Sequence, residues 1–210
     1  MSALYLGRPL LTLEETDSTN AALRQLAQNG ALEGTAVLAR SQTQGRGRQG
    51  RTWHSPPGLG VYLSVLLRPA AWAADDAGWL AVLGGLAVAE ALDRLGVLRV
   101  ALKWPNDVLV NGRKIAGVLV EPRLAERKVE FAVLGAGINI HHRAEDFPQE
   151  LRTLATSCRQ EGVQTDRARA MEVFLECLER RYTEIRQVGF GPLLQAWSAR
   201  VVRPEPKPAE

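Results

Sequence analysis

The chain has 210 residues, of which 46% are apolar, and its formal net charge at pH 7 is +3. This length fits one sizeable domain, and so mild a charge argues against a surface with general affinity for polyanions. The longest weakly polar stretch, residues 77–92, contains three glycines and is too short for a membrane span. The first residues lack the basic and apolar regions of a signal peptide, so a cytoplasmic location is predicted.

The first half of the chain predicts two helices with two strands between them. Residues 17–30, DSTNAALRQLAQNG, combine capping residues at the start with an apolar face and a final glycine, which is typical of a helix. Residues 35–40 and 60–68 are apolar and β-prone, so each predicts a strand. Residues 75–95 predict a long buried helix.

The second half predicts a group of strands followed by helices. The Asn-Gly pair at 111–112 is a strong hairpin signal because both residues tolerate the positive φ of a type I′ turn. Strands are expected at residues 98–104, 108–110, 114–121 and 128–140, and helices at 166–189 and 190–200. This order predicts an α+β fold in which helices flank a central mixed β-sheet. Residues 1–200 form the expected domain, and residues 201–210, rich in proline, an extended tail.

Residues 45–50, GRGRQG, match the G-x-G-x-x-G pattern of a dinucleotide-binding loop. That loop requires a helix to start at its third glycine. Pro56 and Pro57 follow Gly50 too closely for a normal helix, and no acidic residue lies at the right distance to bind a ribose. The segment is therefore interpreted as a glycine-rich, arginine-rich loop and not as a Rossmann motif.

The arginines of this loop indicate a site for an anion. Four arginines and no acidic residue lie between positions 40 and 51, and guanidinium groups suit phosphate. The glycines allow backbone amides to approach a ligand closely. Because the charges repel one another and Trp53 is the only apolar anchor, the loop is expected to be mobile without a ligand. A solvated basic loop without a function is the alternative interpretation.

Further candidate residues lie on the strands of the second half. Lys114 follows the hairpin turn and either projects a cation toward a bound anion or is a surface lysine. Asn106 and Asp107 either contact a metal or ribose or form a structural turn. Asn139, after two glycines, is either a ligand contact or a polar residue at a strand end. The three histidines lack the spacing of a zinc site, and both cysteines are expected to be reduced.

Four segments occur in a characteristic order and spacing: TDSTN, SQTQGRGRQGRTWHSPPGLGVYLS, LKWPNDVLVNGRKIAGVLVE and LGAGINI. Together they closely resemble the biotin protein ligases, the biotin–[acetyl-CoA-carboxylase] ligases. The resemblance is strong over residues 13–140 and weak over residues 141–200. It implies the catalytic fold shared by biotin synthetases and class II aminoacyl-tRNA synthetases.

The resemblance also implies roles for the matching residues. Arg48 and Lys114 would be the catalytic residues, with Arg48 facing a phosphate and Lys114 contacting the biotin carboxylate and the α-phosphate. The biotin site would comprise Ser18, Thr19, Asn20, Gln42, Arg46, Gly47, Arg48 and Lys114. The ATP and adenylate site would comprise Arg48, Arg51, Trp53, Asn106, Asp107 and Asn139. No side-chain cluster is expected to hold a metal by itself, and Mg²⁺ would arrive with ATP, with Asp107 as its candidate protein ligand.

The chemistry implied by the resemblance has two steps. Biotin is first activated with MgATP to biotinyl-5′-AMP, and biotin is then transferred to a specific lysine of a biotin carboxyl carrier protein of acetyl-CoA carboxylase. Cations are needed because the carboxylate and the triphosphate repel each other. The adenylate is a mixed anhydride that water attacks, so a loop that orders over it would protect it.

Two departures from the family pattern shape the remaining expectations. Only about a dozen residues precede the first motif in the sequence, so no DNA-binding helix-turn-helix, DNA partner or transcriptional role is expected. The small C-terminal β-barrel domain of many members has no counterpart after residue 200, which puts carrier docking in doubt. No membrane partner is expected. The sequence does not give the oligomeric state, but a homodimer is favoured because related bacterial enzymes often form homodimers through the central sheet.

Two other functions remain open from the sequence. A lipoate–protein ligase shares the reaction logic and a related fold. A protein that binds biotin or its adenylate without transferring it would act as a sensor.

Overall fold

The computed structural model describes residues 5–69 and 71–202. The strands are β1 (Leu10–Thr16), β2 (Ala36–Gln42), β3 (Gly60–Leu67), β4 (Val100–Lys103), β5 (Asp107–Val110), β6 (Arg113–Ala125) and β7 (Lys128–Asn139). The α-helices are α1 (Thr19–Gln28), α2 (Trp79–Arg94), α3 (Arg167–Val188) and α4 (Gly191–Ser198). Short 3₁₀ helices span Arg48–Gly50, Ala74–Gly78, Ala144–Asp146 and Gln149–Leu151.

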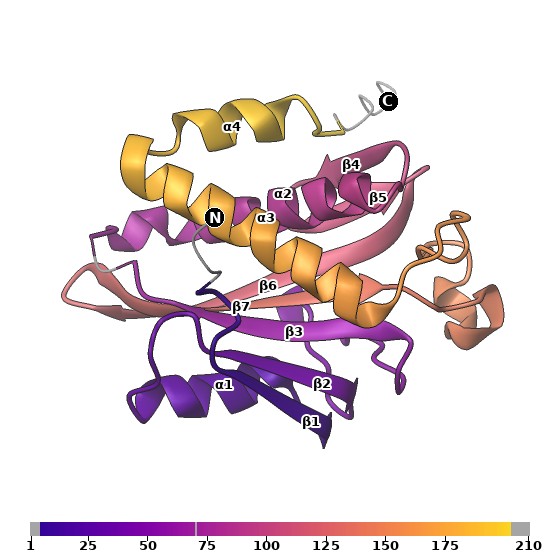
Figure 1. The fold of residues 1–210 in the computed structure, drawn as a ribbon, viewed down its shortest axis with the longest axis horizontal. Coiled ribbons are helices and arrows are strands. Elements are labelled where there is room, and N and C mark those ends of the chain that lie inside the picture. Colours follow the sequence, from indigo (N-terminus) through magenta and orange to yellow (C-terminus); the bar gives the residue numbers. More distant parts are fainter. Residues whose placement is uncertain (1–4, 70, 203–210) are drawn as a thin grey trace, which may run out of the picture.

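All seven strands form one sheet in the order β1-β2-β3-β7-β6-β5-β4 (Figure 1). β1 and β2 are parallel, whereas each of the other neighbouring pairs is antiparallel. The prediction of a central mixed sheet flanked by helices is therefore confirmed.

The expectation that the chain opens with a helix is wrong, because β1 precedes α1. β1 is an edge strand whose residues are mostly exposed, and its sequence, LLTLEET, has leucines only among its first four residues, which is too short an apolar signal to predict a buried strand. Its parallel pairing with β2 matters for the site, since both strands end at the same edge of the sheet. There Thr43 N donates to Thr16 O at 2.9 Å and Gln44 N to Asp17 O at 2.9 Å. The start of α1 is thus joined to the start of the arginine-rich loop, residues 44–52, which is called the arginine loop.

The other predicted elements are present with shifted ends. The expected helix at 75–95 begins as a 3₁₀ turn and continues as α2, and β6 extends beyond the predicted end at residue 121. The hairpin turn is confirmed, since Asn111 and Gly112 have φ values of 50° and 78°. Val202 N donates to Leu102 O of β4 at 2.8 Å, so the first residues of the predicted tail continue along the sheet. Its remainder, 203–210, lies outside the described residues.

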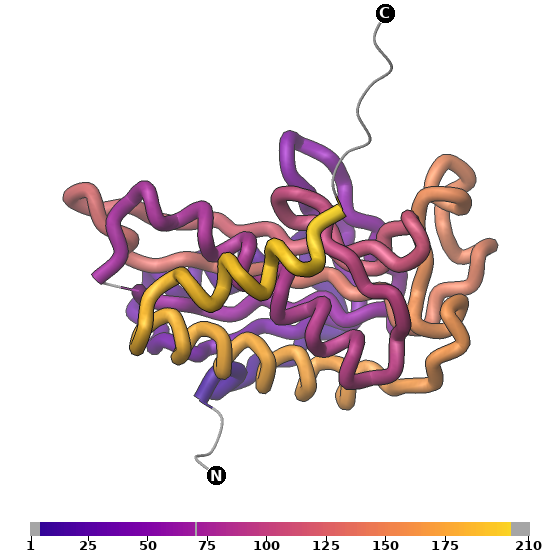
Figure 2. The backbone as a smooth tube through the Cα atoms, turned by 90° about the horizontal axis from the view of Figure 1, so that it is seen from above, coloured from indigo at the N-terminus to yellow at the C-terminus, as the bar shows by residue number. Residues whose placement is uncertain are grey.

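Helices α2, α3 and α4 cover one face of the sheet, and α1 lies on the other (Figure 1). The view from above shows α3 and α4 side by side over the sheet (Figure 2). Their apolar faces enclose the main core with alternate residues of the central strands, among them Leu63, Leu134 and Ile138. A smaller cluster beneath α1 includes Leu23, Leu66 and Val133. Because α1 is short, it covers only part of its face, and the candidate site occupies the rest.

Candidate active site

A cavity of about 480 Å³ opens on the α1 side of the sheet. It is lined by the start of α1, the arginine loop, the β4–β5 turn and the strands β6 and β7. All thirteen residues named above as site candidates lie along it: Ser18, Thr19, Asn20, Gln42, Arg46, Gly47, Arg48, Arg51, Trp53, Asn106, Asp107, Lys114 and Asn139. The tertiary structure therefore brings together residues that the sequence separates by more than a hundred positions.

Glycines form the floor of this cavity. Strand residues alternate between faces, so in the segment LGAGIN both Gly135 and Gly137 face the cavity while Leu134 and Ile138 face the core. A Cβ at Gly137 would overlap the Trp53 indole, and one at Gly135 would overlap the Asn20 side chain. The absence of side chains thus lets Trp53 and Asn20 lie directly on the sheet backbone.

One end of the cavity is lined with neutral polar groups in a continuous hydrogen-bond network. The Gln42 amide oxygen accepts from Thr19 N at 2.9 Å and from the Thr19 hydroxyl at 3.1 Å. Its Nε2 donates to Ser55 Oγ at 2.8 Å. Ser64 Oγ lies 2.8 Å from Thr19 Oγ1 and 2.6 Å from Asn20 Oδ1. These contacts fix the orientation of polar side chains that would otherwise rotate, as recognition of a small polar ring requires.

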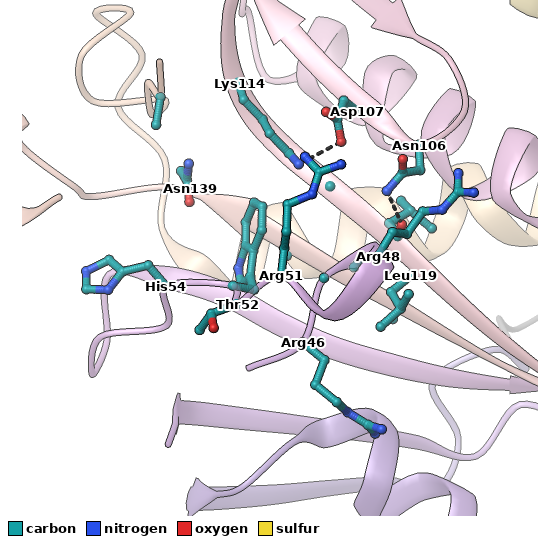
Figure 3. Close-up of a pocket in the computed structure, with 18 of the residues that line it drawn as sticks. Arg46, Arg48, Arg51, Thr52, His54, Asn106, Asp107, Lys114, Leu119 and Asn139 are labelled. Atoms are coloured by element: carbon teal, nitrogen blue, oxygen red, sulfur yellow. Dashed lines mark hydrogen bonds and ion pairs between the residues drawn. The ribbon is translucent and has the colours of Figure 1, made fainter. Parts of the chain in front are cut away.

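The other end of the cavity is cationic. Lys114 Nζ lies 2.6 Å from Asp107 Oδ1 and 5.2 Å from the centre of the Trp53 ring. The Arg51 guanidinium points toward this ion pair, and Arg48 points toward Asn106 (Figure 3). Within the described residues the Arg48 guanidinium has no hydrogen-bond or ion-pair partner. Free guanidinium donors beside a lysine make this end suited to phosphate.

Arg46 differs from the other loop arginines because it points in the opposite direction (Figure 3). Its Nε donates to Ser18 Oγ at 3.3 Å and its Nη1 to Glu121 Oε1 at 3.2 Å. The side chain therefore ties the loop to α1 and β6, with two of its nitrogens bonded within the protein.

The loop itself is folded back on its own backbone. Gly47 N donates to Arg51 O at 2.6 Å and Trp53 N to Gly45 O at 2.8 Å. Residue Gln49 has a φ of 56°, and Arg51 returns to extended geometry with a φ of –70°. No α-helix starts at Gly50 in this described segment, which confirms that GRGRQG is not a Rossmann motif.

Asn106 and Asn139 line the cavity but use their amides to brace the backbone. Asn106 Nδ2 donates to Val118 O at 2.8 Å, which holds the β4–β5 turn against β6. Asn139, which is buried, donates to Thr156 O at 2.9 Å and so anchors the segment that follows β7. Both contacts give these side chains a structural role, and their ligand roles stay predictions.

Several site residues were not recognised in the sequence. Ser55, Ser64 and Glu121 support the polar end, while Trp104 lines the cavity beside Lys103. For Ser64 and Glu121 a signal existed in the period-two alternation of β3 and β6, which places polar residues among apolar ones on the face opposite the core. For Ser55, whose contact depends on the path of the loop, there was none.

Histidine 142 is fully buried beside the cavity and stacks on Phe147, with ring centres 4.7 Å apart. Neither of its ring nitrogens has a hydrogen-bond partner within the described residues. Burial, with a smaller contribution from His54, lowers the pKa of His142 to about 4. The imidazole is therefore neutral at physiological pH.

The described residues contain no group of three or more His, Cys, Asp or Glu side chains placed to hold a metal. The Asp107 carboxylate is partly exposed and borders the cationic end of the cavity. One carboxylate next to a phosphate site fits Mg²⁺, which is commonly held by one or two carboxylates together with substrate phosphates.

Within the described part of the chain, no helix is long and apolar enough to cross a bilayer.

Comparisons with known proteins point to one family. The family model for the biotin/lipoate A/B protein ligase family matches residues 12–139. The bifunctional ligase/repressor BirA of Bacillus subtilis is 38% identical over 92% of this chain and 60% of that protein. The biotin--[acetyl-CoA-carboxylase] ligase of Paracoccus denitrificans is 36% identical over 91% of this chain and 80% of that protein. The chain thus spans about three-fifths of the length of its Bacillus relative.

A solved structure agrees with these relatives. The biotin protein ligase of Aquifex aeolicus, in complex with biotin and ATP, superposes with a TM-score of 0.80 at 32% identity, over 93% of this chain and 79% of that one. The expected fold, like that of class II aminoacyl-tRNA synthetases, is confirmed by this match. The matched segment contains the α1 start, the arginine loop and the glycine floor, so the chain belongs to the biotin/lipoate A/B protein ligase family.

Proposed function

We propose that this chain is the catalytic part of a biotin protein ligase, which adenylates biotin with ATP and transfers the biotinyl group to a lysine of a biotin carboxyl carrier protein. The observation that supports this most strongly is the joining of two chemistries in one cavity. A neutral, rigid polar end suits the ureido ring, and a cationic end suits the phosphates.

The polar end would bind biotin through Ser18, whose hydroxyl accepts from Arg46, and through the hydrogen-bonded pair Thr19 and Gln42. Thr19 and Gln42 orient each other, so their remaining donors and acceptors present a fixed pattern to the ligand. The glycine floor would accept the apolar ring and chain of biotin at close range. Asn20 would act as a brace, since its amide already has protein partners.

In the first step a biotin carboxylate oxygen would attack the α-phosphorus of ATP, and pyrophosphate would leave. Lys114 would approach the carboxylate and the α-phosphate, while Arg48 and Arg51 would offset the charge of the phosphates. Mg²⁺, with Asp107 as its protein ligand, would further neutralise the triphosphate. The Lys114–Asp107 pair would have to exchange partners for this to occur.

In the second step the neutral amine of a carrier lysine would attack the acyl carbon of biotinyl-5′-AMP, and AMP would leave. No nucleophile of the enzyme is required, because the acyl-adenylate is already activated. Trp53, which lies over Gly117 and Gly137 in the cavity, and the arginine loop would shield the intermediate from water until the carrier arrives.

The direct test is mass spectrometry of a biotin carrier domain after incubation with the protein, biotin and MgATP. The expected result is a mass increase of one biotinyl group, together with pyrophosphate release that requires biotin. Pyrophosphate release that is independent of biotin would contradict the proposal.

Two controls separate the related functions. Replacing biotin with lipoate should abolish carrier modification and give no thermal stabilisation; the reverse preference would indicate a lipoate ligase. Stabilisation by biotin without pyrophosphate release would indicate a biotin-binding sensor.

A further inference from the structure

Glu121 of β6 does not line the cavity, yet it contacts both sides of the site. Its Oε2 accepts a hydrogen bond from Asn20 Nδ2 at 2.7 Å, and its Oε1 lies 3.2 Å from Arg46 Nη1. Arg24 Nη1 of α1 lies 3.9 Å from the same Oε1. The carboxylate thus joins the wall of the polar end to the arginine loop.

The surroundings of Glu121 make these contacts stronger than ordinary surface pairs. The side chain is 19% exposed, so solvent screens its charge less than on an open surface. Asn20 is buried and lies over Gly135, and its Oδ1 accepts from Ser64 at 2.6 Å. Without Glu121 one donor of a buried amide would lose its partner, which is costly.

Arg46 depends on Glu121 in a different way. Its remaining contact is the 3.3 Å bond from Nε to Ser18 Oγ. In the described structure Glu121 is the acceptor that gives Arg46 an ion pair, so it offsets one charge of a loop whose charged side chains are all positive. Repulsion among Arg46, Arg48 and Arg51 favours an open loop, and Glu121 opposes it.

We propose that Glu121 is a positioning residue that latches the arginine loop to the biotin end of the cavity. One carboxylate oxygen fixes Asn20 and the other fixes Arg46, so the wall and the loop keep their relative placement. This inference deepens the proposed function. The latch would retain the acyl-adenylate, whereas the cations at the other end of the cavity would form it.

Limited trypsin digestion tests the latch without any ligand, because the loop carries cleavage sites at Arg48 and Arg51. Glu121→Gln keeps the size and one acceptor for Asn20 but removes the charge that holds Arg46. Cleavage at these two sites should become at least about fivefold faster, which corresponds to roughly 1 kcal/mol. The melting temperature should change little.

A matched control lies on the adjacent strand. Glu130 of β7 pairs with Arg123 at 2.9 Å and is 41% exposed, and neither residue lines the cavity. Glu130→Gln should leave loop cleavage unchanged.

In the double variant Glu121→Gln/Arg46→Gln, cleavage should equal that of Arg46→Gln alone, because both substitutions remove the same ion pair between Arg46 and Glu121. Unchanged cleavage in folded Glu121→Gln, or fully additive effects in the double variant, would overturn the proposal.

Release of biotinyl-adenylate gives the functional readout. In Glu121→Gln the intermediate should dissociate several-fold faster, while biotin-dependent pyrophosphate release persists. If even the unmodified protein releases no pyrophosphate, the proposed function fails, but the digestion experiment still decides whether Glu121 holds the loop. Faster digestion with unchanged adenylate retention would overturn the role in retention.

Discussion

Along β7, Leu134, Ala136 and Ile138 belong to the main core, whereas Gly135, Gly137 and Asn139 on the opposite face line the cavity. The same alternation continues on β3, where Leu63 and Val65 face the core while Tyr62 borders the cavity and Ser64 bonds to α1. Alternate residues of the same strand therefore pack in the core, where they support stability, while the residues between them face the cavity proposed to bind the ligands.

The two faces differ in how their interactions are satisfied. The helix-covered face is closed by apolar packing and by the Glu90 carboxylate, which pairs with Arg180 and Arg181. The cavity face leaves donors such as the Arg48 guanidinium unpaired within the described residues and carries bare backbone at its glycines. Changes on the first face should therefore reduce stability, and changes on the second should reduce activity.

The largest expected effect lies on the cavity face. Lys114→Ala should slow biotin-dependent pyrophosphate release by about 10²–10³-fold, because it removes a preorganised cation from the reacting groups. Stability should hardly change, since its pair with Asp107 is partly exposed. Lys128→Ala, at an exposed position of β7, is the control in the same assay. Normal pyrophosphate release in Lys114→Ala would exclude this lysine from the site.

Glu90→Ala should have the opposite signature. Glu90 is 8% exposed and the Arg181 side chain only 15% exposed, so the substitution leaves a largely buried cation without its main partner. The free energy of unfolding should fall by about 3 kcal/mol in urea denaturation, with adenylation unchanged at a temperature where the variant is folded. Glu172→Ala breaks an exposed pair on α3 and should cost less than about 0.5 kcal/mol. Equal losses in the two variants would contradict the comparison.

His142 predicts a loss of stability in acid. Its pKa is about 6.5 when unfolded and about 4 in the folded protein, so the unfolded chain binds the proton more readily between these values. Stability from this residue is present above pH 6.5 and declines as the pH falls toward 4, by about 2 kcal/mol between pH 7 and pH 5.

The measurement is urea denaturation at both pH values for the protein and for His142→Phe. Phenylalanine preserves stacking on Phe147 and does not titrate. The variant should lack about 2 kcal/mol of the pH-dependent loss. An identical pH dependence in the two proteins would show that His142 is not protonated on unfolding in this range.

The smallest effects come from a pair of glycines on the two faces. Gly84→Ala on α2 would place a Cβ 2.7 Å from Val118 Cγ1 and should lower stability by about 1 kcal/mol, since crowding exceeds the gain in helix propensity. Gly137→Ala would displace Trp53 and should raise the Kd for biotin by about tenfold, or about 1.4 kcal/mol. Calorimetric titration and thermal unfolding of both variants would reveal whether the two effects separate.

The sequence alone determined the local elements that carry strong physical signals. Asn111-Gly112 encodes its turn through the positive φ that both residues tolerate, and Pro56-Pro57 excludes a helix after GRGRQG. The motifs also identified residues that line one cavity, because their chemistry and order together are characteristic of the family.

Only the tertiary structure decided which protein groups these side chains contact. Asn20 and Arg46 both bond to Glu121 of β6, and Asn139 bonds to Thr156 in the segment after β7. Glu121 lies 75 residues from Arg46, and no local pattern encodes that contact. Nor does local sequence reveal an exposed edge strand such as β1. Turn geometry depends on neighbouring residues, whereas partners and burial depend on how distant strands pair and which face each side chain occupies.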